Sequence, residues 1–418
     1  MADRVPHLLS AVQPVAATPH LVLSIRPMLS TDALDYHLPP GRIATHPVEP
    51  RDAAKLLVLR RDDPGRFEHR TIADLPSLLD PGDRLICNTT RVLPARFRGF
   101  REETGGGVTG LYLHDDPTPG IWLAMVKARR HKPGSIIRLL MRKTPGAPDT
   151  PSPYALEMLE PAEDPPGAWR LRLRADTLPL PDAPTVLEAV GLTPLPPYIL
   201  AARKAADDAG DDGADREQYQ TVFAEPPAPA PAQPGSVAAP TAGLHFTPRL
   251  LDALAARGVA RTGITLHVGA GTFKPVETAT VEAHPIHAEW CSMSSQAIAE
   301  IRRTRRAGHR VVAIGTTSVR TIESYAPLAD RGDPPAHLST RLLLTPGCSF
   351  GWTDALLTNF HLPRSTLMAL VAAMLQHPDE PPASDGTPVG VLRLKAAYAE
   401  AIARDYRFYS FGDAMLIL

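Results

Sequence analysis

Three histidines stand in polar loops where strand-like and helix-like patterns meet, which is where side chains of an α/β protein can do chemistry. His245 lies in APTAGLHFT, His267 lies in LHVGAGTF directly after a strand-like run, and His361 lies in TNFHLP ahead of an apolar helix pattern. Histidine suits proton transfer because its pKa lies near neutrality. A single loop histidine is more often a hydrogen-bonded structural residue, but three in three such loops make a catalytic role equally credible.

A fourth polar loop, residues 315–320 (GTTSVR), joins the strand-like run RVVAIG to a helix pattern. In open α/β sheets, ligands bind in the crevice beyond the carboxyl ends of the strands, so we expect the four loops to converge there. The helix that begins near residue 316 would offer free N–H groups to a carboxylate or phosphate. The residues by themselves therefore indicate a cytoplasmic enzyme with an anionic or polar substrate and histidine acid–base chemistry.

A metal site is one alternative that the histidines raise. His284-x-x-His287-x-Glu289 has a spacing compatible with metal ligation, but no clear helix pattern lies beneath it and no distant ligand can be named. We therefore expect no metal. The sequence also lacks a GxSxG nucleophile motif, a Walker A loop and a GxGxxG loop after a strand, and its cysteines form no CxxC motif.

The charge balance excludes a protein that binds nucleic acid by bulk positive charge. The 418 residues include 44 Lys+Arg and 45 Asp+Glu, which gives a formal net charge of −1. No apolar run reaches the roughly 18 residues that a membrane-spanning helix needs. One dense basic run remains, and contact with a phosphate backbone there is as credible as a solvated surface. Its members are Lys127, Arg129, Arg130 and Lys132.

Two kinds of pattern must position these side chains. Between about residues 92 and 173, short strand-like runs such as VTGLYL and IWLAMV are separated by turn residues without a convincing helix, which predicts a small antiparallel β-barrel. From residue 247 onward, helix and strand patterns alternate, which predicts a sheet flanked by helices. The predicted fold class is therefore α/β, with a mostly parallel sheet and an inserted small antiparallel β-barrel domain.

The predicted domain boundaries follow these patterns. The apolar stretch in residues 1–31 is too poor for an export signal. We therefore interpret these residues as an N-terminal extension, which we expect to be disordered. Residues 32–91 and 194–418 form the α/β catalytic domain, and residues 92–193 form the barrel domain.

Insertions rich in acidic residues or proline are predicted near residues 204–234. The acidic run 207–217 has almost nothing to bury, so we expect it to be disordered. Residues 226–234 (PPAPAPAQP) are expected to form a stiff polyproline spacer, and 143–153 a long loop. Such segments hold part of the 46 prolines of the chain.

The polar loops, in their order along the chain, resemble those of one enzyme family. The matching stretches include NTTRVLPAR from Asn88, GSVAAPTAGLHFT from Gly235, TLHVGAGTFKPV from Thr265, GTTSVRTIES from Gly315 and DALLTNFHLPRSTL from Asp354. From about residue 35 to its end, the chain is similar to the S-adenosylmethionine:tRNA ribosyltransferase-isomerase family of queuosine biosynthesis. The resemblance implies the same fold, an α/β domain interrupted by a small β-barrel.

The resemblance implies a reaction that consumes S-adenosylmethionine as a substrate rather than as a cofactor. Its ribosyl unit would be transferred to 7-aminomethyl-7-deazaguanine at the tRNA wobble position and isomerised, giving epoxyqueuosine-tRNA, adenine and methionine. The sulfonium acidifies the adjacent C5′ hydrogens, so a base can form a carbanion that triggers the loss of adenine, and a general acid must protonate the purine. His245 and His267 are the acid–base candidates, with His361 as the third.

The resemblance also indicates which groups would position the substrates. We expect a cytoplasmic monomer whose partners are S-adenosylmethionine and tRNA, with contact to the tRNA through the basic run of the barrel and without a membrane. The residues expected to hold ribose, carboxylate or tRNA are Asn88, Arg91, Thr241, Gly243, Gly269, Gly271, Thr316, Thr317, Ser318, Arg320, Asn359 and Asp413.

Some positions depart from the family pattern. Gly107 and Thr109 stand where the family usually carries Lys and Glu, and Thr345 stands where it usually carries Tyr. Because these departures bear on substrate contacts, two alternatives stay open: a paralogue that transfers the ribosyl unit to a small-molecule acceptor, and a non-catalytic RNA-binding relative. The intact GLHF, HVGAG and NFHLP loops argue against the second.

Overall fold

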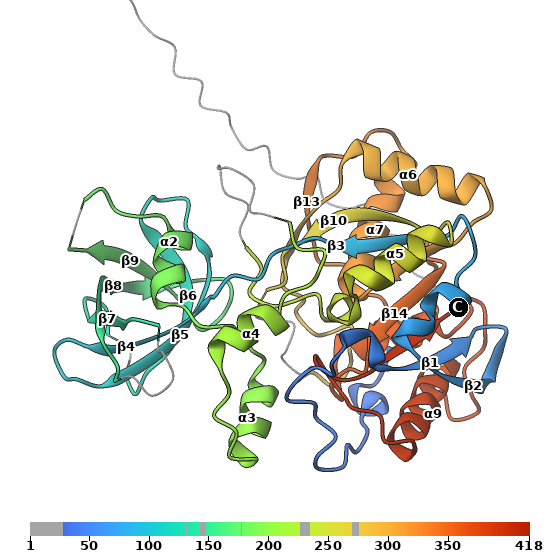
Figure 1. The fold of residues 1–418 in the computed structure, drawn as a ribbon, viewed down its shortest axis with the longest axis horizontal. Coiled ribbons are helices and arrows are strands. Elements are labelled where there is room, and N and C mark those ends of the chain that lie inside the picture. The colour runs from blue at the N-terminus through green and yellow to red at the C-terminus, as the bar shows by residue number, and fades with distance from the viewer. Residues whose placement is uncertain (1–27, 131, 143–147, 177, 226–234, 270–275) are drawn as a thin grey trace, which may run out of the picture.

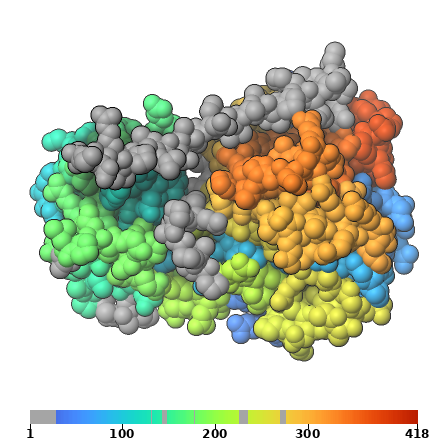
Figure 2. Space-filling model, turned by 90° about the horizontal axis from the view of Figure 1, so that it is seen from above, coloured from blue at the N-terminus to red at the C-terminus, as the bar shows by residue number. Residues whose placement is uncertain are grey.

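The chain folds into two bodies that lie side by side, a helix-covered sheet and a small closed barrel (Figure 1). The computed structural model describes residues 28–130, 132–142, 148–176, 178–225, 235–269 and 276–418. Seen from above, the barrel residues, in teal and green, lie on one side, and the yellow to red residues of the larger body lie on the other (Figure 2). Within these ranges, no helix has both the length and the apolar character that crossing a bilayer requires.

The larger body is built on a mixed sheet. In the described ranges its nine strands have the order β13-β11-β10-β3-β12-β14-β15-β1-β2. At the centre, β10, β3, β12 and β14 are parallel neighbours, and β1 pairs parallel with β15. The pairs at both edges and the pair of β14 with β15 are antiparallel. The predicted fold class is confirmed, with the parallel pairing concentrated at the centre. The strands are β1 Lys55–Arg60, β2 Asp63–Thr71, β3 Arg84–Asn88, β10 Ala260–Leu266, β11 Glu289–Ser292, β12 Val311–Ile314, β13 His337–Thr340, β14 Ala355–Asn359 and β15 Ala414–Ile417.

Helices cover both faces of this sheet because its central strands are apolar on both sides. Every residue of β12 and β14 is buried. One core includes Ile86 and Leu356 and packs against α6, α7, α8 and α9, and the other includes Leu85 and Leu357 and packs against α1 and α5. These helices are α1 Leu75–Leu78, α5 Pro248–Ala256, α6 Ser295–Arg306, α7 Thr316–Ala329, α8 Thr366–Met374 and α9 Val389–Ala403, with 3-10 turns η1 Thr31–Leu34, η2 Arg51–Ala53, η3 Ile72–Asp74 and η4 Thr241–His245.

The chain leaves the centre of the sheet after β3 and forms the barrel before it returns. The barrel is closed in the order β4-β5-β6-β9-β8-β7. Helix α2 packs Val186 and Leu187 into the same core as Phe97 and Trp122, so this helix belongs with the barrel. The elements are β4 Arg96–Arg101, β5 Gly107–Asp115, β6 Ile121–Lys127, β7 Ile136–Leu140, β8 Pro151–Pro161, β9 Ala168–Ala175 and α2 Ala183–Val190.

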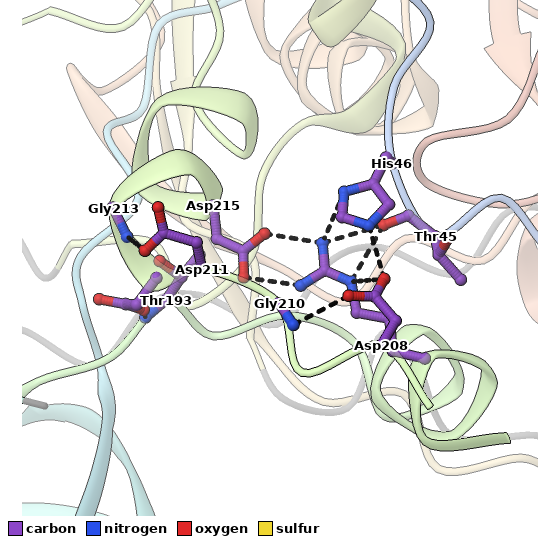
Figure 3. A network of polar contacts seen from close by, with 10 residues as sticks. Thr45, His46, Thr193, Asp208, Gly210, Asp211, Gly213 and Asp215 are labelled. Carbon is purple, nitrogen blue, oxygen red and sulfur yellow. Dashed lines mark hydrogen bonds and ion pairs between the residues drawn. The ribbon is translucent and has the colours of Figure 1, made fainter. Parts of the chain in front are cut away.

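The expectation of disorder in the acidic run 207–217 is wrong, because part of this run forms a helix. Helix α3, Pro197–Ala205, is followed by α4, Asp212–Gln218, whose first turn is capped by the Asp211 carboxylate. The carboxylate of Asp215 accepts two hydrogen bonds, of 2.7 and 2.8 Å, from the buried guanidinium of Arg203 (Figure 3). This guanidinium also donates to the carbonyl of Thr45 in the larger body, so the acidic run is ordered by a cation from another helix.

Three other predicted segments fall partly or wholly outside the described residues. Residues 226–234, the predicted polyproline spacer, lie outside the described residues. Of the predicted loop 143–153, residues 143–147 lie outside them and residues 151–153 belong to β8. Residues 1–27 of the predicted extension are also outside. Next to them, Leu29 is buried in the core of the larger body, and the hydroxyl of Thr31 donates to the carbonyl of Thr278 at 2.8 Å.

Candidate active site

The four parallel strands at the centre of the sheet end at the same edge. The register pairs Ile264 of β10 with Asn88 of β3, Ile314 of β12 with Cys87 of β3, and Ile314 with Leu357 of β14. The loops that follow these strands carry the polar side chains that the sequence singles out, including His267, Thr316 and His361. The predicted convergence of these loops at one sheet edge is therefore what the topology produces.

Two adjoining cavities open at this edge. The larger has a volume of about 380 Å³ and lies between the two bodies, because its lining includes His114 and Asp164 of the barrel as well as His267 and Arg320 of the larger body. The smaller, of about 60 Å³, lies over the ends of β12 and β14. Val268 and Leu367 line both cavities, so the two form neighbouring compartments of one site.

His267 lines the larger cavity, and two contacts hold its ring. Its Nδ1 lies 2.9 Å from the hydroxyl of Thr90, and its ring stacks on Trp290 with centroids 4.9 Å apart. The other face of Trp290 stacks on His337. The Nε2 atom of His267 is buried and has no hydrogen-bond partner among the described residues. Burial lowers the pKa of His267 to about 4, so the imidazole is neutral at pH 7 and can take up a proton at Nε2.

Arg320 presents its guanidinium to the same cavity. Nη1 forms an ion pair with the buried carboxylate of Glu289, and Nε donates to the carbonyl of Leu342 at 3.1 Å. The other oxygen of Glu289 accepts from the backbone N–H of Gly269 at 3.2 Å, which ties the HVGAG loop to the same carboxylate. Nη2 of Arg320 is buried without a partner in the described ranges. A carboxylate is the natural ligand for such a donor.

Among the described residues, those that line the two cavities do not include His245. Its ring lies behind the side chain of Asn359. The Asn359 amide nitrogen is 3.2 Å from His245 Nε2, and the Asn359 carbonyl oxygen accepts from the Thr241 hydroxyl at 2.8 Å. Burial lowers the pKa of His245 to about 3, and the charges of Arg407 and Arg51 act in the same direction. Thr241 and Asn359 line the smaller cavity, so His245 contacts that cavity through Asn359.

His361 lines the smaller cavity, but its Nε2 lies 2.9 Å from the hydroxyl of Thr358 on β14. Burial lowers its pKa to about 4. The N-terminus of α7 faces the same cavity through Thr316 and Thr317, and the Thr317 hydroxyl is buried without a partner in the part of the chain that is described. Ser318 instead donates its hydroxyl to the carbonyl of Ile314 within the helix start.

The other predicted site residues fall into different environments. Asn88 exchanges hydrogen bonds with the backbone of Leu266, so it joins the ends of β3 and β10. Asp413 accepts from the backbone of Lys55 and Arg407, and burial raises its pKa. Of the other predicted site residues, Arg91 is exposed and donates to the carbonyl of Glu225. Gly243 is closely packed, because a Cβ added there would lie 3.0 Å from Thr221. Gly271 lies outside the described residues.

The basic run of the barrel lies at one end of this domain. Lys127, Arg129, Arg130 and Lys132 are all exposed. They lie at the end of β6 and in the loop after it, and β6 pairs Met125 with Ala168 at the start of β9. The turn between β8 and β9, which contributes Asp164 to the cavity, is therefore at the same end of the barrel.

Three side chains that contact His267 or Arg320 were missed or misread in the sequence. Thr90 and Trp290 carry no motif in the sequence, because each meets His267 only through the packing of the fold. Glu289 was considered only as part of a metal motif, whereas its carboxylate holds Arg320. His284 and His287 line the larger cavity, and Nδ1 of His287 lies 3.3 Å from a carboxylate oxygen of Asp164 in the barrel. In the described ranges, no group of three or more His, Cys, Asp or Glu is placed to hold a metal ion.

Comparison with known proteins gives one consistent result. The family model described as "Queuosine biosynthesis protein" matches residues 31–417. S-adenosylmethionine:tRNA ribosyltransferase-isomerase of Acidiphilium cryptum is 44% identical over 385 residues, covering 92% of this chain and 97% of that protein. The enzyme of the same name from Thermus thermophilus is 43% identical and covers 93% of this chain and 99% of the relative. A crystal structure of S-adenosylmethionine tRNA ribosyltransferase from Thermotoga maritima matches at 30% identity with a TM-score of 0.46, covering 92% of this chain and all of that one.

Proposed function

This chain belongs to the queuosine biosynthesis protein family, and from that membership we propose the reaction that its site performs. The protein is an S-adenosylmethionine-dependent tRNA ribosyltransferase-isomerase. It transfers the ribosyl unit of S-adenosylmethionine to 7-aminomethyl-7-deazaguanine at the tRNA wobble position and isomerises it, giving epoxyqueuosine-tRNA, adenine and methionine. S-adenosylmethionine is consumed, so the proposal requires no resident cofactor or metal. The reaction takes place in the cytoplasm on a monomeric enzyme.

One observation carries the chemical part of the proposal. The larger cavity contains two buried polar atoms that have no protein partner in the described ranges, Nε2 of His267 and Nη2 of Arg320. Leaving such atoms unpaired costs free energy, so a site that does so is built for a polar ligand. S-adenosylmethionine supplies both a carboxylate for the guanidinium and acidic C–H groups beside its sulfonium for the imidazole.

His267 is the base in this scheme. Its Nε2 takes a proton from C5′, so the C–H bond breaks, an N–H bond forms, and the electron pair stays on the carbon next to the sulfonium. Adenine then leaves with the electron pair of its glycosidic bond and takes up a proton. A neutral imidazole is required for the first step, and the pKa of about 4 keeps His267 neutral across the physiological range.

The smaller cavity adjoins the larger one and suits the hydroxyl groups of the ribose. Hydroxyl and amide groups of Thr241, Thr317 and Asn359 gather there, at the N-terminus of α7. His361 lies in the same compartment, but burial keeps its imidazole neutral at pH 7, so the proton that adenine takes up is supplied by water. His245 positions Asn359, and of the histidines in the sequence-based scheme His267 alone keeps a proton-transfer role.

The tRNA approaches from the side of the barrel. The exposed basic run, Lys127, Arg129, Arg130 and Lys132, lies at the barrel end that contributes to the larger cavity, and it supplies the cations that phosphate contacts need. A wobble base that leaves the anticodon stack would enter between the two bodies.

A paralogue activity on a small acceptor is the second candidate, and the position of one departure from the family pattern favours it. Thr109 pairs in register with Lys127, so this departure lies beside the basic run. One assay separates the two functions: S-adenosylmethionine is incubated with an anticodon stem–loop that carries the aminomethyl-deazaguanine. Adenine release with a mass gain on the RNA supports the tRNA reaction. Adenine release that needs only the free base would replace it with the second candidate.

A further inference from the structure

The hydroxyl of Thr90 is the only described side-chain group that the structure places in hydrogen-bond contact with the imidazole of His267. Their atoms lie 2.9 Å apart, although the two residues are 177 positions apart in sequence. They are brought together because Thr90 follows β3 and His267 follows β10, and these strands are parallel neighbours. The contact is therefore a product of the sheet topology.

Thr90 is itself fixed in place. Its side chain is 3% exposed, and its backbone N–H donates to the side-chain carbonyl of Asn88 at 3.1 Å. The same Asn88 exchanges hydrogen bonds with the backbone of Leu266, the residue before His267. One amide thus sets the spacing between the loop that carries the hydroxyl and the loop that carries the imidazole.

A hydroxyl partner has a chemical consequence that a carboxylate partner would not have. A hydroxyl oxygen can accept from Nδ1–H, which leaves a lone pair on Nε2, and it can also donate to Nδ1, which leaves a proton on Nε2. The stacked Trp290 fixes the plane of the ring, so the Thr90 contact decides which way Nε2 points in that plane. Nε2 is the atom that lies unpartnered at the cavity.

We propose that Thr90 is a positioning residue for the reaction: its hydroxyl oxygen accepts a hydrogen bond from Nδ1–H of His267 and thereby holds the Nε2 lone pair toward the substrate. This inference rests on the proposed function, in which His267 is the base. During proton transfer Nε2 gains the proton from C5′, and the Nδ1–H bond to the Thr90 oxygen is kept throughout, so the imidazolium that forms remains hydrogen-bonded.

The test is a set of variants assayed for single-turnover adenine release with S-adenosylmethionine and the modified stem–loop. Thr90→Val keeps the shape and removes the hydroxyl, Thr90→Ser restores the hydroxyl, and His267→Ala removes the base. Thr89→Val is the matched control, because its hydroxyl contacts the carbonyl of Ile264 rather than the imidazole. Thermal unfolding of each variant shows whether it is folded.

We expect Thr90→Val to lower kcat about tenfold or more with KM for S-adenosylmethionine within about threefold of wild type, and Thr90→Ser to recover most of kcat. In the His267→Ala background, Thr90→Val should have no further effect, because the hydroxyl acts through the imidazole. Loss of kcat in Thr89→Val equal to that in Thr90→Val, or an undiminished effect of Thr90→Val without His267, would overturn the inference. If His267→Ala itself keeps wild-type kcat, the proposed function of His267 fails instead.

Discussion

The amide nitrogen of Asn359 lies 3.2 Å from Nε2 of His245 and donates to it. An amide nitrogen does not accept hydrogen bonds, so Nε2 of His245 is the acceptor, and the neutral imidazole carries its proton on Nδ1. The Asn359 carbonyl accepts from Thr241, which fixes the orientation of the amide. The histidine that the GLHF loop supplies thus supports the group that faces the smaller cavity.

This relationship distinguishes two histidine variants. His245→Ala leaves the buried Asn359 amide without one partner, so it should lower the free energy of unfolding by about 1–3 kcal/mol and also lower kcat/KM. His267→Ala should lower kcat by about 100- to 10,000-fold at nearly unchanged stability. Urea unfolding and adenine-release kinetics on both proteins check this pair of expectations. Wild-type stability of His245→Ala would speak against its role behind Asn359.

Stability should fall as the pH drops below about 6.5. Burial holds the pKa values of His267 and His361 at about 4 and helps to hold that of His245 at about 3, against an ordinary value of 6.5. The unfolded chain therefore takes up protons near pH 6.5 that the folded chain takes up only near pH 4 or below. The stabilisation is complete above pH 6.5 and is lost progressively as the pH falls to about 4 for His267 and His361 and to about 3 for His245. The loss is at most on the order of 3 kcal/mol for each of the first two groups and about 5 kcal/mol for His245. Urea midpoints at pH 7.5 and 5.0 measure it, and a His361→Gln variant should show a shallower dependence. Equal midpoints in the wild type would refute this account.

Glu289 should matter to S-adenosylmethionine binding even though it reacts with nothing. Glu289→Gln removes the charge that pairs with Arg320 and weakens the hold on Gly269, so we expect kcat/KM to fall about tenfold, mainly through KM. Glu400→Gln is the control, because Glu400 lies on α9 and pairs with Arg404 just after that helix, and neither residue lines a cavity of the site. Unchanged KM in Glu289→Gln would show that Arg320 does not bind the substrate carboxylate.

The buried pair between Arg203 and Asp215 should contribute far more to stability than a surface pair on the same helix. Asp215→Asn removes the carboxylate that accepts both short hydrogen bonds of buried Arg203 and leaves the longer ion pair with Asp208, at 3.8 Å, so we expect a loss of about 3–5 kcal/mol in urea unfolding. Glu188→Gln breaks an exposed pair with Arg216 and should cost at most about 1 kcal/mol. Similar losses in the two variants would mean that the acidic helix is not locked to the larger body.

The basic run of the barrel should set the salt dependence of tRNA binding. Replacing Arg129 and Arg130 with Ala should lower affinity and reduce the slope of log K against log salt by about 0.7–0.9 for each lost phosphate contact. Arg305 and Arg306 are exposed on α6, which leads into the opposite end of β12, so their Ala variants serve as the control. An equal change in both double variants would indicate non-specific charge rather than a contact surface.

The sequence allowed the prediction of the fold class, because strand and helix periodicity is a local property of the chain. It also allowed the prediction of the sheet edge where the loops meet, because ligands bind beyond the carboxyl ends of parallel strands. It did not allow assignment of side chains to cavities. His245 and His267 look alike in their polar loops, and only the packing puts one behind Asn359 and the other at a cavity. The order of the acidic run was missed for the same reason, since composition does not reveal that Arg203 is buried against Asp215.

The central claim is that Nε2 of His267 removes a proton from C5′ of the bound S-adenosylmethionine. The most direct measurement uses S-adenosylmethionine that carries deuterium at C5′. The deuterium is followed as this substrate reacts with the modified stem–loop. The wild-type enzyme should release label to water with a primary isotope effect, and His267→Ala should release it at least about 100-fold more slowly. Label release by His267→Ala at the wild-type rate would show that another group is the base.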